Sequence, residues 1–137
     1  MTRIRVVIAE DHPQMALHLR ALLASEYDVR IVSDGWALMA AVDLETPDII
    51  ISDIRMPGLN GLAAALSIRA KHPELPLIFV SIQDDPAVIR KALAEGARGY
   101  VIKSDAGDEL ASAVEAVLGG GRYLSSSARD ALGSGPA

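Results

Sequence analysis

The sequence contains no cysteine among its 137 residues. This absence excludes a disulfide scaffold, a thiolate-held metal or iron–sulfur cluster, and a cysteine nucleophile. Aromatic residues make up only 4% of the chain, and no apolar run approaches the roughly 20 residues that a membrane-spanning helix needs. The apolar start, Ile4 to Ala9, lacks a signal-peptide cleavage pattern and is followed directly by Glu10 and Asp11. We therefore expect a cytoplasmic protein that has no membrane partner.

Positive charge is also scarce, because 13 lysine and arginine residues stand against 18 aspartate and glutamate residues and leave a net charge of −5. Proteins that wrap a phosphate backbone usually present a basic face. We therefore expect no DNA contact from this segment itself. Half of the residues are hydrophobic, which is enough to bury a core. The length fits one domain of roughly 100 to 150 residues with a short tail.

Five short apolar runs recur along the chain and are predicted to be β-strands. Each run is rich in β-branched residues and continuously apolar, which is typical of parallel strands that helices cover on both faces. Between the runs, apolar residues recur at helical spacing. This alternation predicts an α/β fold, a flavodoxin-like (βα)₅ doubly wound parallel sheet with strand order 2-1-3-4-5. The expected strands are Ile4–Ala9, Val29–Val32, Ile49–Ile51, Leu77–Val80 and Tyr100–Ile102.

Three consecutive glycines, Gly119 to Gly121, are predicted to end the last helix. Asp105 is a candidate to open that helix. Beyond the glycines the residues become small and polar, with only a weak helical pattern over residues 128–132. We therefore predict one domain over residues 1–120 and a C-terminal tail or linker over residues 121–137.

Polar residues stand directly after four of the expected strands: Glu10 and Asp11, then Asp53, Ser81 and Lys103. The carboxyl ends of parallel strands meet at one edge of a sheet, so these side chains are expected to converge. Clustered carboxylates repel one another and are expected to hold a hard cation, for which Mg²⁺ is the natural candidate. Asp53 can then act as a nucleophile towards a phosphoryl group, while Lys103 and Ser81 pair with its oxygens.

Four motifs in this order resemble the receiver domain of bacterial two-component response regulators. The resemblance covers about residues 3–120. It is carried by the acidic pair Glu10-Asp11, the stretch I-S-D-I-R-M-P-G-L-N-G over Ile51–Gly61, Ser81 after a buried strand, and G-Y-V-I-K over Gly99–Lys103.

The resemblance implies that Asp53 accepts a phosphoryl group from a phosphohistidine on a sensor histidine kinase, with Mg²⁺ required. It further implies that the backbone carbonyl of Arg55 joins Glu10, Asp11 and Asp53 around the metal. Ser81 and Tyr100 would form the switch pair. Phosphorylation would then change the surface formed by the fourth helix, fifth strand and fifth helix, with a homodimer as one readout.

Two further segments, E-D-H-P from Glu10 and G-G-G-R-Y-L-S from Gly119, resemble the NarL/LuxR subfamily. The implied output is control of transcription through a helix-turn-helix domain outside this chain, which would also make the DNA contacts. A receiver of this kind is not expected to be an enzyme. A stand-alone receiver that acts through protein–protein contacts is the alternative.

Two other functions fit the expected topology less well. Haloacid-dehalogenase-like phosphatases also form an aspartyl phosphate, but they need a second acid two residues after the nucleophile, where this chain has Arg55. A flavodoxin-like cofactor site needs a phosphate-cradling loop after the first strand. Here Glu10 and Asp11 occupy that place and would repel an FMN phosphate.

Several of these residues also have simple structural interpretations. Asp11 is a candidate helix cap, Tyr100 a candidate core aromatic, and Lys103 alone would pass for a solvated lysine. Gly58, Asn60 and Gly61 are expected to form a turn after Asp53.

Some neighbouring positions depart from the receiver pattern or lack a predicted role. Ile82 follows Ser81 where a small residue is usual, so we expect it to narrow access to the site and to slow small donors. The bond from Lys103 to Ser104 is expected to be trans, because serine stands where many receivers have proline. The three histidines, His12, His18 and His72, follow no metal-ligand spacing and are expected at the surface.

Overall fold

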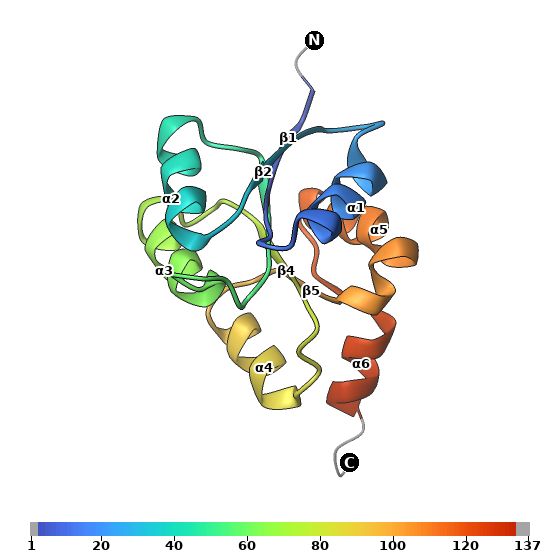
Figure 1. Ribbon diagram of the computed structural model, residues 1–137. Coiled ribbons are helices and arrows are strands. Elements are labelled where there is room, and N and C mark those ends of the chain that lie inside the picture. Colours follow the sequence, from blue (N-terminus) through green and yellow to red (C-terminus); the bar gives the residue numbers. More distant parts are fainter. Residues whose placement is uncertain (1–2, 134–137) are drawn as a thin grey trace.

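Six parallel strands form the sheet, and the polar residues predicted above lie at one of its edges. The structure is a computed structural model that describes residues 3–133 (Figure 1). The strand order β2-β1-β3-β4-β5-β6 confirms the predicted order of the first five strands and adds a sixth. The observed strands are β1 (Arg5–Ala9), β2 (Asp28–Val32), β3 (Ile49–Ser52), β4 (Leu77–Ser81), β5 (Gly99–Ile102) and β6 (Tyr123–Leu124).

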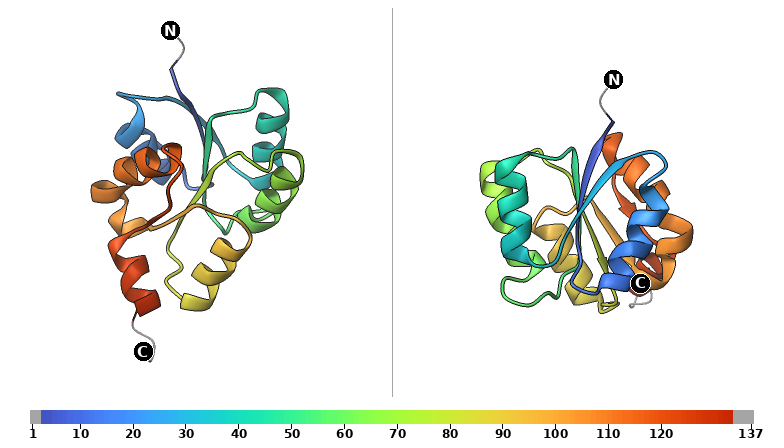
Figure 2. Two further views of the ribbon diagram at one scale, coloured as in Figure 1. Left: turned by 180° about the vertical axis from the view of Figure 1, so that it is seen from behind. Right: turned by 45° about the horizontal axis from the view of Figure 1, so that its top comes forward.

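Helices cover both faces of the sheet, with α1 and α5 on one face and α2, α3 and α4 on the other (Figure 2). Pro13 and Pro86 occupy first-turn positions of α1 and α4, where a missing N–H costs nothing. Within residues 3–133 no helix has the length and apolar composition to cross a membrane. The helical elements are α1 (Pro13–Leu23), α2 (Gly35–Leu44), α3 (Gly61–Lys71), α4 (Pro86–Ala94), the 3₁₀ turn η1 (Lys103–Asp105), α5 (Ala106–Leu118) and α6 (Ser126–Gly133).

Successive residues of each central strand point to opposite faces, and both faces are buried. In β1, Val6 and Ile8 pack in the cluster beneath α1 and α5, whereas Val7 packs in the cluster beneath α2 and α3. This two-sided burial explains why the strands are continuously apolar in sequence. The edge of the sheet that carries the polar residues therefore rests on strands that are packed on both faces.

The segment after Gly121 differs from the expected tail. Residues 123–124 form β6 beside β5, and residues 126–133 form α6, whose Ala128 is completely buried. The polar composition did not predict α6, because this helix has a narrow apolar face and is held mainly by side chains of other elements. The expected domain boundary at residue 120 stays a prediction, and residues 134–137 of the expected tail lie outside the described residues.

Candidate functional site

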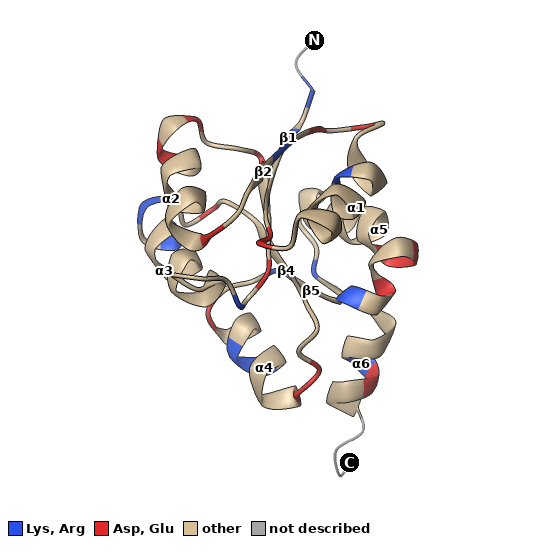
Figure 3. Ribbon diagram, viewed as in Figure 1, with Lys and Arg blue, Asp and Glu red and all other residues tan. Residues whose placement is uncertain are grey.

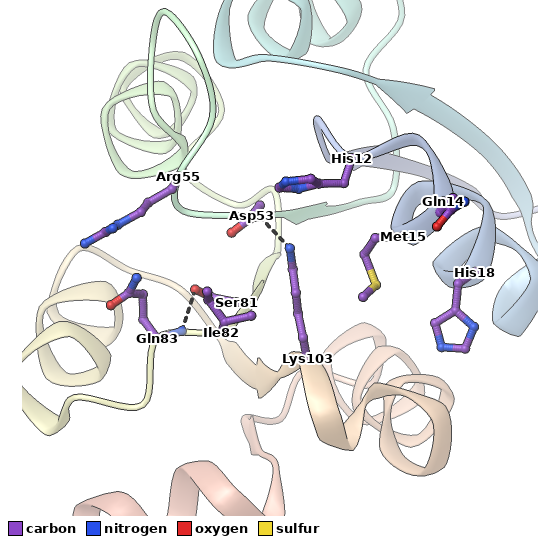
Figure 4. A pocket seen from close by; sticks show the side chains of 10 residues that line it. All are labelled: His12, Gln14, Met15, His18, Asp53, Arg55, Ser81, Ile82, Gln83 and Lys103. Atoms are coloured by element: carbon purple, nitrogen blue, oxygen red, sulfur yellow. Dashed lines mark hydrogen bonds and ion pairs between the residues drawn. The ribbon is translucent and has the colours of Figure 1, made fainter.

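The predicted polar side chains lie together at the carboxyl edge of the sheet. Parallel pairing aligns Ala9 with Ser52 and Ser81 with Ile102, so the residues after β1, β3 and β5 reach the same level. Glu10 and Asp53 are only 2% and 7% exposed. Asp53 lines a cavity of about 610 Å³ that opens between α1 and the β4–α4 loop (Figure 4). A small group can therefore approach a carboxylate that is otherwise buried.

Lys103 bridges two of the carboxylates. Its Nζ lies 2.7 Å from Asp53 Oδ2 and 2.6 Å from Glu10 Oε1. The stem of Lys103 is nearly buried, and its ammonium points towards Asp53 across the cavity (Figure 4). The other oxygen of Asp53, Oδ1, accepts a hydrogen bond of 2.7 Å from the backbone N–H of Ile54. Both oxygens of the candidate phosphoacceptor are thus oriented before any ligand arrives.

Burial and pairing act in opposite directions on these groups. Burial raises the pKa of Asp53, and the nearby negative charge of Glu10 adds to that effect, while Lys103 opposes it. Burial also acts to raise the pKa of Glu10, but hydrogen bonds from Lys103 and His12 outweigh it and hold that pKa below its usual value. Burial acts to lower the pKa of Lys103, but Asp53 and Glu10 together raise it. Lys103 therefore stays charged.

The acidic side of the site has the donor chemistry of a hard-cation site. Glu10, Asp11, His12 and Asp53 each offer a ligand atom within 4.8 Å of the others. Asp11 Oδ1 is buried without a hydrogen bond among the described residues, although His12 Nδ1 lies 3.3 Å away. An unsatisfied carboxylate oxygen beside two further carboxylates fits a divalent cation that prefers oxygen ligands. Glu10 and Asp11 follow β1 directly in the chain, and Figure 3 shows acidic ribbon in the middle of the molecule.

Ser81 and Tyr100 meet the same loop residue. Ser81 Oγ accepts a 3.0 Å hydrogen bond from the Gln83 N–H, and the Tyr100 hydroxyl donates a 2.7 Å hydrogen bond to the Gln83 carbonyl. Tyr100 is completely buried, and burial raises its pKa to about 12, so the hydroxyl is neutral. Tyr100 is therefore a core aromatic with a polar contact to the loop that follows Ser81.

Two glycines that follow Asp53, Gly58 and Gly61, shape the chain between β3 and α3 in different ways. Gly58 has a φ of 74°, which makes it a true turn residue. Gly61 instead allows close approach, because a Cβ there would lie 2.0 Å from the carbonyl oxygen of Asp53. Asn60 caps α3 by accepting from the Ala63 N–H. The expected turn is confirmed, and Gly61 serves packing against Asp53 rather than turning.

The chain matches the response regulator receiver domain family over residues 6–115. It belongs to the response regulator receiver family. It is 34% identical over 125 residues to the transcriptional regulatory protein DegU of Brevibacillus brevis, a match that covers 89% of this chain and 53% of that protein. It is also 34% identical over 122 residues to DesR of Bacillus subtilis, covering 87% of this chain and 60% of DesR.

Solved structures agree with this assignment. A LuxR-family two-component response regulator from Aurantimonas sp. SI85-9A1 superimposes with a TM-score of 0.91 at 29% identity, covering 97% of both chains. The isolated receiver domain of RcsB from Salmonella enterica, in the presence of the phosphomimetic BeF₃⁻, superimposes with a TM-score of 0.86 at 26% identity, covering 96% of this chain and 99% of that one. The chain spans about half to three fifths of the length of the curated relatives it matches.

The structure brings the predicted polar side chains together, but three contacts of this receiver were not predicted from the sequence. His12 is exposed, as expected, yet its backbone N–H and Nδ1 both lie 3.1 Å from Glu10 Oε2, so it holds that carboxylate. Gln83 had no predicted role. Asp105 makes no side-chain cap on α5 and instead bonds Ser127. Such contacts depend on loop geometry, which residue spacing does not encode.

Other expectations at the site have simple outcomes. Asp11 does not cap α1, because that helix has no side-chain cap. The Lys103–Ser104 bond is trans, since residues 3–133 contain no cis peptide. Ile82 is 71% exposed and lines the cavity, so its effect on access stays a prediction. The metal role of the Arg55 carbonyl also stays a prediction.

Proposed function

We propose that Asp53 is the phosphoacceptor of this receiver and takes its phosphoryl group from a phosphohistidine on a sensor histidine kinase. The observation that supports this most is the Asp53 carboxylate, buried and bonded to Lys103 at 2.7 Å, yet adjoining an open cavity. A buried carboxylate with a fixed cation and access to solvent is suited to nucleophilic attack rather than to packing.

The proposed transfer is a displacement at phosphorus. A carboxylate oxygen of Asp53 bonds to phosphorus while the P–N bond of the phosphohistidine breaks, and the departing imidazole nitrogen takes up a proton from solvent. Lys103 then pairs with a phosphoryl oxygen, and the Ser81 hydroxyl donates to another. Both groups already lie at the cavity, so little rearrangement is needed.

A divalent cation completes the charge balance of this proposal. Glu10, Asp11, Asp53 and the backbone carbonyl of Arg55 would hold Mg²⁺, and when bound it would neutralise negative charge on the phosphoryl oxygens. The unsatisfied Asp11 Oδ1 supports this assignment. His12, which bonds Glu10 Oε2, would fix that carboxylate in place.

The output proposed is control of transcription in the cytoplasm. The curated relatives DegU and DesR are named transcriptional regulatory proteins, and this chain spans only part of their length. We infer a helix-turn-helix domain outside this chain as the part that contacts DNA. Switching would run through Ser81 and Tyr100 to the face of α4, β5 and α5, with a homodimer as one readout.

Intact-mass spectrometry with Mg²⁺ and phosphoramidate tests the phosphoacceptor directly. We expect one phosphoryl adduct on the wild type and none on Asp53→Asn. The matched control is Asp84→Asn, which removes an exposed carboxylate from the β4–α4 loop beside the site and is expected to keep the adduct. A cognate kinase replaces phosphoramidate if Ile82 excludes the small donor.

The adduct must also have the properties of an acyl phosphate. We expect it to require Mg²⁺ and to be lost in alkali. An adduct that persists on Asp53→Asn, or one that forms equally well in excess chelator, would contradict the assignment of Asp53 and of the metal respectively.

A further inference from the structure

The outer face of α2 is apolar, although the outer face of a surface helix is usually polar. The buried residues on its inner face are Gly35, Leu38, Ala41 and Val42. On the outer face, Trp36 and Leu44 are 62% and 77% exposed, and the exposed Ala40 lies between them. These three residues stand four apart and so form one stripe along the helix, the α2 stripe. Figure 1 shows α2 at the outer side of the molecule, away from α6. Exposed apolar side chains that gather in one place, rather than singly, mark an interaction surface.

Trp36 is positioned by the loop between β3 and α3. A Cβ at Gly58 would lie 3.3 Å from Cδ1 of the Trp36 indole, so the ring lies beside this glycine. The Gly35 N–H donates a 3.1 Å hydrogen bond to the Leu59 carbonyl, which joins the start of α2 to the same loop. Tryptophan is enriched among the residues that dominate binding at protein interfaces, and an ordered side chain loses little entropy on binding. Trp36 is therefore a pre-organised anchor for a partner.

The α2 stripe is complementary to itself. Its side chains run large, small, large, with the small Ala40 in the middle. If two such stripes cross in antiparallel orientation, a two-fold axis passes beside Ala40, and Trp36 of one copy meets Leu44 of the other. The small central side chain lets the two helix axes approach closely, and residues spaced four apart form the ridges that pack most often between helices. The same surface can therefore serve both partners.

The charges beside the stripe also suit a second copy. Asp43, the neighbour of Leu44, pairs with Lys71 of α3 at 3.6 Å, and Glu45 pairs with Arg5. Both carboxylates are thus balanced within their own chain, so a copy that brings the same groups adds little repulsion. The last turn of α2 contains no basic residue. The negative end of its helix dipole would therefore gain from the positive N-terminal end of an antiparallel α2. These charges favour a second copy over a highly charged partner.

We propose that the α2 stripe is the contact surface of a weak symmetric dimer of this chain. α2 of one copy crosses α2 of the other in antiparallel orientation, with Ala40 of both copies at the two-fold axis. This surface is separate from the face of α4, β5 and α5 proposed for switching, and the dimer does not require phosphorylation. One helix face per copy is a small contact, and interfaces below about 1,200 Å² are typical of transient complexes. We therefore expect a dissociation constant between roughly 10 µM and 1 mM.

Tryptophan fluorescence and sedimentation velocity test the dimer on the complete, unphosphorylated chain. Trp36 is the only tryptophan, so its emission reports on the stripe alone. From about 1 µM to about 1 mM, we expect its emission to shift to shorter wavelength as the sedimentation coefficient rises. Leu44→Glu is expected to weaken the dimer at least about tenfold, whereas Leu17→Glu, at an exposed leucine of α1, keeps it. A wild type that stays monomeric at about 1 mM, or a dimer that persists in Leu44→Glu, would overturn the proposal.

Disulfide cross-linking tests the arrangement at the two-fold axis and does not depend on Leu44→Glu being folded. The chain has no cysteine of its own, so Ala40→Cys carries one thiol per copy. Residue 40 meets its counterpart across the axis, within the short reach of a disulfide. With the oxidant diamide, we expect Ala40→Cys to form linked dimers about tenfold faster than Ala21→Cys, at an exposed alanine of α1. Equal rates for the two variants would refute the antiparallel α2 contact.

Discussion

At the scale of single residues, the site is held in an unfavourable charge state. Glu10, Asp11 and Asp53 carry three negative charges, and Lys103 supplies the one positive charge that pairs with two of them. Burial raises the pKa of Asp53, which means that its charged form is disfavoured in the folded protein. Such a cluster lowers stability and is typical of a site that is completed by a cation and a phosphoryl group.

This imbalance predicts opposite effects for two substitutions. Lys103→Met leaves the buried carboxylates without their cation and is expected to lower the free energy of unfolding by about 3 kcal/mol. Asp53→Asn removes one repelling charge and is expected to raise it by about 1 kcal/mol. Urea unfolding of both variants at neutral pH measures these changes.

Mg²⁺ provides the control for this interpretation. A cation that binds only the folded state adds roughly 1.4 kcal/mol at ten times its dissociation constant. We expect this gain in the wild type and a larger one in Lys103→Met, where no ammonium competes for Glu10 and Asp53. If Lys103→Met were as stable as the wild type without Mg²⁺, the charge-balance argument would be wrong.

Gly61 predicts a second residue-scale effect. A Cβ at this position would lie 2.0 Å from the Asp53 carbonyl oxygen, so backbone has to move. We expect Gly61→Ala to lower the free energy of unfolding by about 2 kcal/mol and to weaken Mg²⁺ binding by displacing Asp53. Gly107→Ala in α5 is the matched control, because nothing lies within 4 Å of its Cβ position, and it is expected to gain about 0.5 kcal/mol. Thermal unfolding and Mg²⁺ titration of the two variants distinguish crowding from general helix effects.

At the scale of elements, Asp105 and Glu109 clamp the beginning of α6 by accepting hydrogen bonds from the Ser127 and Ser126 N–H groups, and this clamp depends on pH. Burial acts to raise the pKa of Asp105, but hydrogen bonds from Ser125 and Ser127 outweigh it and lower that pKa. Glu109 behaves in the same way through Ser126 and Tyr123. Because both pKa values are lowered in the folded state, the clamp contributes fully above the ordinary carboxylate range. Its contribution is lost as the pH falls through the lowered values.

We therefore expect α6 to loosen below about pH 4, near or under the usual pKa of these side chains. The amide resonances of Ser126 and Ser127 in two-dimensional NMR spectra report this locally. Arg129, which lies 4.0 Å from Glu109, adds a favourable charge to the clamp. In Asp105→Asn the resonance of the Ser127 amide is expected to stop changing with pH in the acid range. If that resonance still changed with the same midpoint pH as in the wild type, a group other than Asp105 would be responsible.

At the scale of the whole molecule, the sequence predicted the central fold because burial on both faces produces a readable pattern. Each of the first five strands lies within one residue of its expected limits, as with Ile4–Ala9 against β1 at Arg5–Ala9. The convergence of Glu10, Asp53 and Lys103 followed from topology alone. Parallel pairing brings strand ends together whatever the loops do.

The parts that sequence reasoning missed depend on contacts between elements distant in the chain. α6 has a weak helical pattern, and its partners Asp105 and Glu109 are 17 to 22 residues away. Asp105 has the sequence signature of a helix cap, which its actual role on another helix contradicts. His12 and Gln83 act through single hydrogen bonds that no periodicity marks.

The central fold and the C-terminal segment attached to it together predict how the molecule responds to shortening. A chain that ends at Gly121 keeps all five central strands with their covering helices, so we expect it to fold. It loses the burial of Leu124, Ala128 and Leu132 and the pairing along the β5 edge, so its free energy of unfolding is expected to fall by about 3 kcal/mol. Urea unfolding measures both the midpoint and the slope. A shortened chain that does not fold would show that residues 123–133 belong to the obligatory core of the receiver.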